Sequence, residues 1–298
     1  MIEEQDHLES FSHIPVMSEE VMSLLKIISE GVYVDGTIGL GGHSESILSQ
    51  LSHSGHLIGI DRDVQALEIC RKRTLTKHSN FSLFNDSYSN IRNILDQKGV
   101  LEVNGMLLDL GLSSFQLDNS RRGFSFKRNE NLDMRFDNFQ KISASDIINK
   151  FSEKDIADII FIYGEERLSR KIARKIVQLR PITTTFELVG AIQKSTPPKN
   201  RNKTIARVFQ AIRIIVNDEL KKLEEFLDVF YKRLCVGGRV VLISFHSLED
   251  RMIKHKFKTL EKHKKIRVLT KKPLYPTKLE STQNRRSRSA KLRAAEKI

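Results

Sequence analysis

The chain has 298 residues and a formal net charge of +13, with 39% hydrophobic and 29% charged residues, a composition that can bury a core and excludes collagen-like, disordered and membrane-embedded chains. Its two cysteines, Cys70 and Cys235, are too few for a disulfide framework or a cysteine zinc site, and both are expected to be small buried hydrophobes. The longest apolar runs are about a third of a membrane span, and the acidic N-terminus has no signal-peptide core, so we expect a cytoplasmic protein with no membrane partner.

The first part of the chain alternates predicted strands and helices. Apolar runs that mostly end in an acidic residue predict strands, and the segments 44–51 and 64–73 between them have helical periodicity. This alternation favours a parallel, doubly wound α/β sheet, in which ligands bind outside the carboxyl ends of the strands. The predicted strands are 31–35, 56–61, 81–86 and 103–109.

The rhythm stops after Leu117, and the sequence predicts a helical insert. Residues 118–217 contain no convincing strand pattern, and three stretches within them have helical patterns. We therefore predict a sheet domain made of 1–117 and 218–298, interrupted by a helical insert domain, 118–217, for substrate recognition. The predicted helices of the insert are 152–163, 168–179 and 186–193.

The sheet pattern resumes with a helix, 218–234, a turn at Gly237 and Gly238, and a strand, 239–245. Residues 247–260 then predict a helix. Two short strands are expected after it, at 266–269 and 290–294.

The positive charge is concentrated at the C-terminal end of the chain. Residues 251–298 contain 17 Lys or Arg and 3 Asp or Glu, a net charge of +14, whereas the preceding 250 residues hold 33 basic and 34 acidic residues. The segment suggests a polyanionic partner, with Arg285, Arg286 and Arg288 in an extended strand or loop along phosphates. A basic tail that only aids solubility and an acidic membrane surface are the alternatives that composition leaves open.

A glycine-rich stretch, 36–43, follows the first predicted strand. An acidic residue ends each of the first two predicted strands. Asp35 ends the first, and Asp61 ends the second, where a carboxylate can accept both hydroxyl protons of a ribose. The dinucleotide fingerprint would need a glycine at position 44, which is Ser44. Because Asp35 would repel a pyrophosphate but suits an amino-acid ammonium group, S-adenosyl-L-methionine fits better than a nicotinamide cofactor. An ordinary tight loop is the other interpretation.

Nine sequence blocks resemble the signature of the bacterial ribosomal small-subunit methyltransferase H family, also called MraW, and they run in order along nearly the whole chain. The resemblance implies a Rossmann-like class I S-adenosylmethionine-dependent methyltransferase sheet with an inserted helical domain. It also implies methylation of the exocyclic N4 amine of a cytosine in the decoding region of 16S rRNA. The blocks are HIPVM (13–17), DGTIGLGGH (35–43), DRD (61–63), LDLGLSS (108–114), RGFSF (122–126), LDMR (132–135), YGEER (163–167), FQAIR (209–213) and ISFHSLEDR (243–251).

The resemblance also implies the cofactor site. It assigns Gly41, Gly42 and His43 to the loop around the cofactor and Asp61 to the ribose. Tyr88 is expected beside the adenine, and Asp109 and Gln116 near the methionine end. Phe115 stands where the family commonly has proline.

Neither cysteine lies at the carboxyl end of the fourth predicted strand, so attack by a nitrogen rather than a cysteine-assisted carbon methylation is expected. Asp109 is the first candidate for orienting the amine, with Ser113 and Ser114 as lesser ones. Phe124 or Phe126 could stack on an extruded base. The alternatives are that Asp109 caps a turn and that both aromatics belong to the core.

His246, Glu249 and Asp250 form a cluster in sequence, for which capping and substrate contacts are expected rather than a metal.

Other functions stay open at the level of sequence. A small-molecule methyltransferase, or one acting on another RNA, would use the same cofactor site. A nucleic-acid-binding protein without cofactor activity would explain only the basic segment. The 16S rRNA in the small ribosomal subunit is the expected partner, and a homodimer is left open because the sequence does not determine the oligomeric state.

Overall fold

The computed structural model describes residues 15–74, 78–118 and 121–298. The chain divides into two compact units, a sheet unit of Met1–Gly111 with Leu223–Ile298 and a helical unit of Leu112–Lys222. The sequence placed the boundaries at 117/118 and 217/218. The second boundary of the structure falls within helix α12 (Glu219–Val229).

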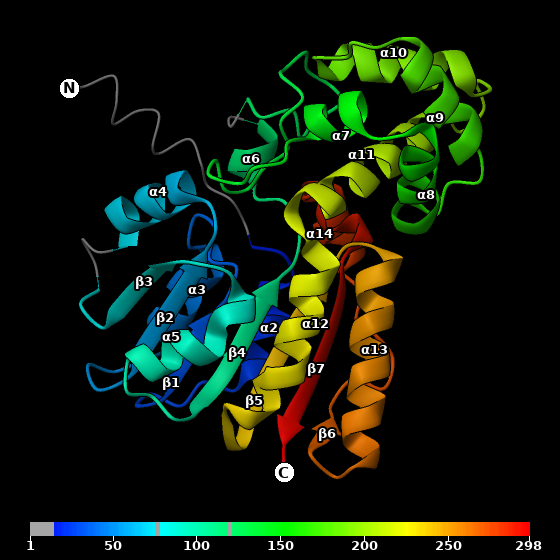
Figure 1. Ribbon diagram of the computed structural model, residues 1–298. Helices are drawn as coiled ribbons and strands as arrows, with labels where there is room; N and C mark the ends of the chain where they lie inside the picture. Colours follow the sequence, from blue (N-terminus) through cyan, green and yellow to red (C-terminus); the bar gives the residue numbers. More distant parts are fainter. Residues whose placement is uncertain (1–14, 75–77, 119–120) are drawn as a thin grey trace. The chain divides into compact units, whose positions relative to one another are not determined.

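Seven strands form one sheet among the described residues, in the order β3-β2-β1-β4-β5-β7-β6 (Figure 1). Strands β1 to β5 pair in parallel, and β7 runs antiparallel to both β5 and β6. This sheet, with helices on both faces, confirms the predicted α/β fold class. The strands are β1 (Val32–Asp35), β2 (His56–Asp61), β3 (Phe81–Asn85), β4 (Val103–Asp109), β5 (Leu234–Ser244), β6 (Ile266–Val268) and β7 (Lys291–Lys297).

The strand order reverses direction between β1 and β4. From β1 the chain builds outward through β2 to β3, and then crosses back to place β4 on the other side of β1. In open sheets of this kind, ligands bind outside the carboxyl ends of the strands at such a reversal. The topology therefore directs attention to the residues that follow β1, β2, β4 and β5.

The sheet is buried on both faces. Met106 and Leu108 of β4 pack in one apolar cluster with α5, α12 and α13, whereas Leu107 packs in the other, with α2, α3 and α4. Alternate side chains of a strand point to opposite faces, so both clusters need apolar residues, and a nearly continuous apolar strand results. The helices are α2 (Ser18–Leu25), α3 (Gly42–Leu48), α4 (Val64–Thr74), α5 (Ile91–Gln97), α13 (Ser247–Lys262) and α14 (Lys278–Gln283). Figure 1 shows α5, α12 and α13 on the near face.

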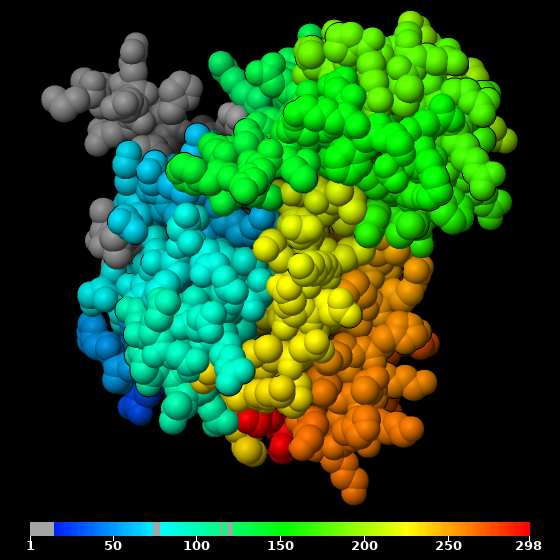
Figure 2. Space-filling view, in the orientation of Figure 1, coloured from blue at the N-terminus to red at the C-terminus, as the bar shows by residue number. Residues whose placement is uncertain are grey.

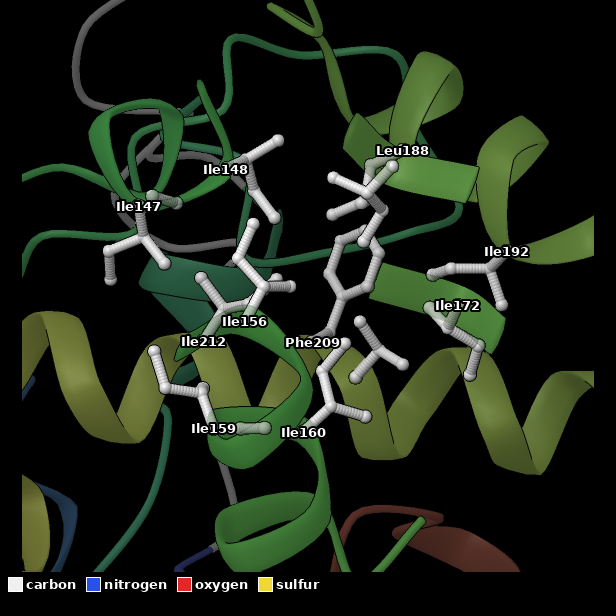
Figure 3. Close-up of a cluster of buried hydrophobic side chains, with 14 of the residues drawn as sticks. Ile147, Ile148, Ile156, Ile159, Ile160, Ile172, Leu188, Ile192, Phe209 and Ile212 are labelled. Carbon is white, nitrogen blue, oxygen red and sulfur yellow. The ribbon is translucent and has the colours of Figure 1, made fainter. Parts of the chain in front are cut away.

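The helical unit has its own core of isoleucine and leucine side chains around Phe209 (Figure 3). Capping starts its helices: Ser143 and Asp146 form a capping box, as do Thr184 and Glu187, and Ser152 caps α8. The three predicted helices correspond to α8, α9 and α10, while α7 and α11 were not predicted. The helices are α6 (Ser114–Asp118), α7 (Ala144–Lys150), α8 (Glu153–Gly164), α9 (Ser169–Gln178), α10 (Thr185–Ser195) and α11 (Arg201–Asn217).

The predicted turn at Gly237 and Gly238 is wrong. Strand β5 begins earlier, at Leu234, and both glycines lie inside it at an irregularity, because the pairing with β4 passes from Leu234 directly to Arg239. Gly237 has φ of +79°, and a Cβ on Gly238 would lie 2.8 Å from the Cys235 carbonyl oxygen. The pair therefore forms a bulge rather than a connection.

The basic segment is part of the fold, which contradicts the alternative of a solvated tail. It contributes most of α13, β6, α14 and β7, and Leu292, Ala294 and Ala295 of β7 are fully buried. Phe257 of α13 lies against Phe230 beside the sheet, with ring centroids 5.9 Å apart. In Figure 2 the atoms of α12 (yellow) and α13 (orange) lie side by side. Within the described ranges, we find no helix long and apolar enough to cross a membrane.

Candidate active site

The loop after β1 is fastened to the ends of two strands, β2 and β4. The Gly36 amide donates to the Leu107 carbonyl of β4, and the Ile38 amide to the Ile60 carbonyl of β2. The Thr37 hydroxyl accepts from the amide of Asp109 at 2.7 Å. A Cβ on Gly36 would lie 2.3 Å from Leu108 Cδ2 and 3.0 Å from Tyr88 Cβ. Only glycine fits there, and Tyr88 is thereby brought to the loop.

Two further glycines shape the turn into α3. Gly39 has φ of +51° and Gly41 of +87°, in the left-handed region that favours glycine. Helix α3 begins at Gly42, and the buried His43 is in its first turn. Gly41 and Gly42, which the family resemblance assigned to the cofactor, therefore lie in a loop whose backbone a ligand can approach closely.

Asp61 accepts hydrogen bonds from two backbone amides at the loop and can accept further hydrogen bonds from a ligand. Its two carboxylate oxygens accept from the Gly39 amide at 2.8 Å and the Asp63 amide at 2.9 Å. Burial raises the pKa of the Asp61 carboxyl to about 6, against the lowering effect of these hydrogen bonds. Each carboxylate oxygen has a second lone pair, so two ribose hydroxyls can still donate to Asp61.

Asp35 braces the loop from a buried position, and its expected contact with an ammonium group stays a prediction. Its side chain is 2% exposed, and it accepts from the Ser44 hydroxyl at 2.7 Å and from the Thr37 amide at 3.3 Å. Burial raises the pKa of the Asp35 carboxyl. Ser44, which the sequence used only to exclude the dinucleotide fingerprint, is thus a partner that holds Asp35 inside the loop.

His43 and Asp109 lie together at the reversal point with buried polar atoms that lack partners. His43 Nε2 is 3.7 Å from Asp109 Oδ2, too far for a hydrogen bond. Among the described residues, neither ring nitrogen of His43 nor Oδ1 of Asp109 has a hydrogen-bond partner. Buried polar groups in folded proteins are nearly always paired, so these three atoms indicate a place completed by a ligand.

Polar and aromatic contacts fix the segment at the end of β3. Asn85 donates to the carbonyls of Asp61 and Arg62, which ties β3 to β2. Asp86 accepts from the Ser87 amide and the Asn90 side chain. The Tyr88 ring meets Phe226 edge-on, with centroids 5.8 Å apart. Tyr88 is therefore held by packing beside the loop.

Ser113 and Gln116 engage each other at the start of α6. The Ser113 amide donates to Gln116 Oε1 at 3.1 Å, and the Gln116 amide to Ser113 Oγ at 3.2 Å. This reciprocal pair is a capping box. Both residues belong to the helical unit, whereas Asp109 belongs to the sheet unit. The side chain of Ser114 lies outside the described residues.

Phe124 is a core residue, which corrects its expected role as a base-stacking ring. It is 5% exposed in the core of the helical unit and stacks on Phe136, with ring centroids 5.5 Å apart. Phe126 is partly buried and meets Phe209 edge-on at 5.6 Å. Of the two aromatic residues in the RGFSF block, Phe124 fills the core of the helical unit and Phe126 is partly exposed.

His246 and Glu249 lie together after β5, and Asp250 lies apart from them. His246 Nδ1 accepts from the Glu249 amide at 3.4 Å, and Nε2 is 3.2 Å from Glu249 Oε1. Asp250 instead pairs with Arg293 at 2.6 Å and Lys291 at 3.6 Å. The capping role expected of His246 is observed.

Arg285, Arg286 and Arg288 lie in a turn rather than in an extended segment. They follow α14, and the short 3₁₀ helix Ser287–Ser289 includes Arg288. Arg285 and Arg288 are exposed, and Arg288 donates to the Ser281 carbonyl. The sequence missed a second basic region. Residues 112–222 hold 22 Lys or Arg against 13 Asp or Glu, a net charge of +9 that the near-neutral total of residues 1–250 concealed.

The donor set fits S-adenosylmethionine. Asp61 offers acceptors for a ribose, Tyr88 an aromatic surface beside the glycine loop, and His43 with Asp109 unpaired polar atoms for the amino-acid end and the reacting groups. The carboxylates of Asp35 and Asp61 at the loop would repel the negative charges of a pyrophosphate.

Comparison with known proteins gives a consistent result. The model of the MraW methylase family matches residues 10–298. The ribosomal RNA small subunit methyltransferase H of Caldicellulosiruptor bescii is 45% identical, over 97% of this chain and all of that protein. The proteins of the same name from Trichormus variabilis and Thermosipho africanus are each 47% identical, over 97% and 96% of this chain and 92% and 98% of theirs.

Proposed function

The chain belongs to the MraW methylase family, and we propose from this that it methylates the exocyclic N4 amine of a cytosine in the decoding region of 16S rRNA. It is an S-adenosylmethionine-dependent methyltransferase. Its relatives are named for the RNA of the small ribosomal subunit, which is the proposed substrate. The choice of cytosine N4 rests on the resemblance of the sequence blocks.

The chain's own residues would hold the cofactor at the ends of β1, β2 and β4. Asp61 would accept from the ribose hydroxyls, Tyr88 would lie beside the adenine, and His43 would meet the amino-acid end. When bound, S-adenosylmethionine supplies a methyl group on a positively charged sulfur. The loop that these residues share is fastened within the fold by Thr37, Asp35 and Ser44, so little ordering is needed on binding.

Asp109 would act on the target amine. The lone pair of an exocyclic cytosine amine is delocalised into the ring, so the nitrogen must be oriented before it can attack. As this nitrogen forms a bond to the methyl carbon, the bond between that carbon and the cofactor sulfur would break, with its electron pair staying on sulfur, and the nitrogen would then release one proton to Asp109 or to water. Asp109 Oδ1, buried and without a partner among the described residues, can accept a hydrogen bond from the amine and strengthen it as positive charge develops on nitrogen.

The observation that carries the proposal is the group of three unpaired polar atoms on His43 and Asp109 at the strand reversal, in a chain matched by the family model over residues 10–298. A site with these properties explains why polar atoms are buried where the fold itself gives them no partner.

The test is transfer of a radiolabelled methyl group from S-adenosylmethionine to small ribosomal subunits from a strain that lacks the enzyme. Label should appear in 16S rRNA as N4-methylcytosine at one position. Label at another RNA position, or only in a small molecule of the extract, would overturn the assignment of substrate while retaining the cofactor site.

The helical unit is the proposed substrate-recognition element, and its net charge of +9 supports that role, since phosphate contacts supply most of the affinity for RNA. The homodimer and the cytoplasmic location are further proposals. Sedimentation of the purified protein tests the first, and fractionation of the host cell tests the second.

A further inference from the structure

His246 carries a buried donor that the fold does not use. It lies between β5 and α13, and its side chain is 7% exposed. Nδ1 accepts from the Glu249 amide, and an accepting ring nitrogen carries no proton, so the hydrogen-bond network assigns the proton of the neutral ring to Nε2. Nε2 has no hydrogen-bond partner in the described part of the chain, since Glu249 Oε1 at 3.2 Å is not aligned with it.

The ring is held firmly in this orientation. Glu249 is 3% exposed, and its other carboxylate oxygen accepts from the Phe245 amide at 3.0 Å. Glu249 therefore contacts both ring nitrogens, its amide at Nδ1 and its carboxylate 3.2 Å from Nε2, and these contacts fix the direction in which the Nε2 proton points. An unsatisfied buried N–H costs free energy, and its persistence in a rigid setting indicates an acceptor that arrives with a ligand.

His246 lies at the same edge of the sheet as Asp109. Asp109 is paired with Ile243 of β5, and the Leu110 amide donates to the Ile243 carbonyl. Phe245 lies over Gly111, where a Cβ would be 3.0 Å from its ring. The chain segments after β4 and β5 are therefore in contact, so the segment that carries His246 lies next to the end of β4, where Asp109 is.

We propose that His246 reads the target base. Its Nε2 proton would be donated to the N3 or O2 acceptor of the cytosine, while Asp109 accepts from the N4 amine. This inference rests on the proposed function. Cytosine presents a donor at N4 next to acceptors at N3 and O2, whereas uracil presents an acceptor at position 4 next to a donor at N3. A fixed acceptor beside a fixed donor matches cytosine and opposes uracil, and a flipped base is read through such bonds to its Watson–Crick edge.

Two substitutions separate this role from capping. His246→Asn keeps an oxygen near the position of Nδ1, which can cap α13, and has no group at Nε2. His246→Gln keeps an N–H donor near the position of Nε2 and loses the capping acceptor. His255→Asn is the matched control, because His255 is an exposed residue on the same helix. For each full-length variant we would measure kcat/KM on small subunits from the enzyme-deficient strain, the thermal midpoint, and cofactor affinity.

If His246 reads the base, His246→Asn lowers kcat/KM by about 10- to 100-fold, the effect of losing a buried hydrogen bond to substrate, with unchanged thermal midpoint and cofactor affinity. His246→Gln retains more activity than His246→Asn although it is less stable. Wild-type kcat/KM in His246→Asn, or losses in both variants that follow their loss of stability, would overturn the inference. Failure of the proposed function is distinct, since wild-type protein would then not form N4-methylcytosine at all.

Discussion

Asp61 is expected to couple cofactor binding to pH. Its pKa in the folded protein is raised to about 6 from 3.8, so this group lowers the free energy of unfolding as pH rises from about 4 to about 6. Ribose hydroxyls donate best to the ionised carboxylate, and only about one molecule in ten is ionised at pH 5. We therefore expect S-adenosylmethionine to bind about tenfold more weakly at pH 5 than at pH 8.

Calorimetry at pH 5, 6, 7 and 8 checks this dependence. Asp61→Asn is the control. It should lose roughly 1.5 to 3 kcal/mol of binding free energy at pH 8 and should no longer show the rise in affinity near pH 6. An equal rise in the variant would assign the dependence to another group, such as Asp35, whose pKa burial also raises.

Asp109 is expected to matter more for turnover than for cofactor binding. Asp109→Asn preserves the shape of the side chain and removes its charge, so stabilisation of positive charge developing on the amine is lost, while the contact with the cofactor is largely kept. We expect kcat to fall by about 10²-fold or more, as when a positioned electrostatic group is removed. Single-turnover rates and the cofactor Kd, measured on one preparation, decide the matter. Proportional losses in both would make Asp109 a cofactor ligand only.

At the scale of elements, the glycine loop should be intolerant of a single methyl group. Gly36→Ala places a Cβ 2.3 Å from Cδ2 of the buried Leu108 and 3.0 Å from Tyr88 Cβ. We expect the loop to shift, with a loss of roughly 1 to 3 kcal/mol in the free energy of unfolding and weaker cofactor binding. Urea denaturation and calorimetry give the two quantities.

The chain offers a matched control for this substitution. A Cβ on Gly190 meets nothing within 4 Å, and Gly190 lies inside α10. Gly190→Ala should therefore stabilise the protein by about 0.5 to 1 kcal/mol through better helix propensity and leave cofactor affinity unchanged. If both substitutions had the same effect on affinity, close packing at Gly36 would not be the cause.

At the scale of the whole molecule, charge placement should govern RNA binding. Replacing Arg285, Arg286 and Arg288 with Ala should weaken binding to small subunits and flatten its salt dependence by up to about 0.7 to 0.9 log units per lost phosphate contact. Cofactor affinity should not change, because these residues lie in the turn after α14. Filter binding at salt concentrations from about 50 to about 300 mM, a range that includes physiological ionic strength, measures how steeply binding falls with salt.

A triple variant of Lys254, Lys258 and Lys262 removes the same charge from exposed positions on α13. Equal weakening in the two variants would mean that net charge alone acts. Stronger weakening in the arginine variant would support direct phosphate contacts, and wild-type binding in it would contradict them.

Much of the sheet and of the candidate site follows from sequence because the signal is local. The apolar run of β2 ends in Asp61, and the glycines after Asp35 are adjacent in the chain to the residues they serve. The site residues that could not be predicted depend on packing. A phenylalanine can either stack on a base or fill a core, so the residue type of Phe124 does not distinguish the two roles. Only its neighbours in the structure, such as Phe136, show that it belongs to a core. The RGFSF sequence would be the same whether its first aromatic residue stacked on a base or filled the core.

The sequence by itself determined the parallel strands and the glycine-rich loop, since each depends on residues close together in the chain. It also determined the class of cofactor and the family, because the sequence blocks that indicate them can be read in order along the chain without knowledge of the fold. Only the tertiary structure decided that Asp35 is buried against Ser44 and that β7 lies between β5 and β6. It also decided that His43 and Asp109 lie together with buried polar atoms that have no hydrogen-bond partner among the described residues. The reason is physical: burial and pairing are set by partners far away in sequence, as when Val241 of β5 pairs with Ala294 of β7, and no local pattern records which distant residue a side chain will meet.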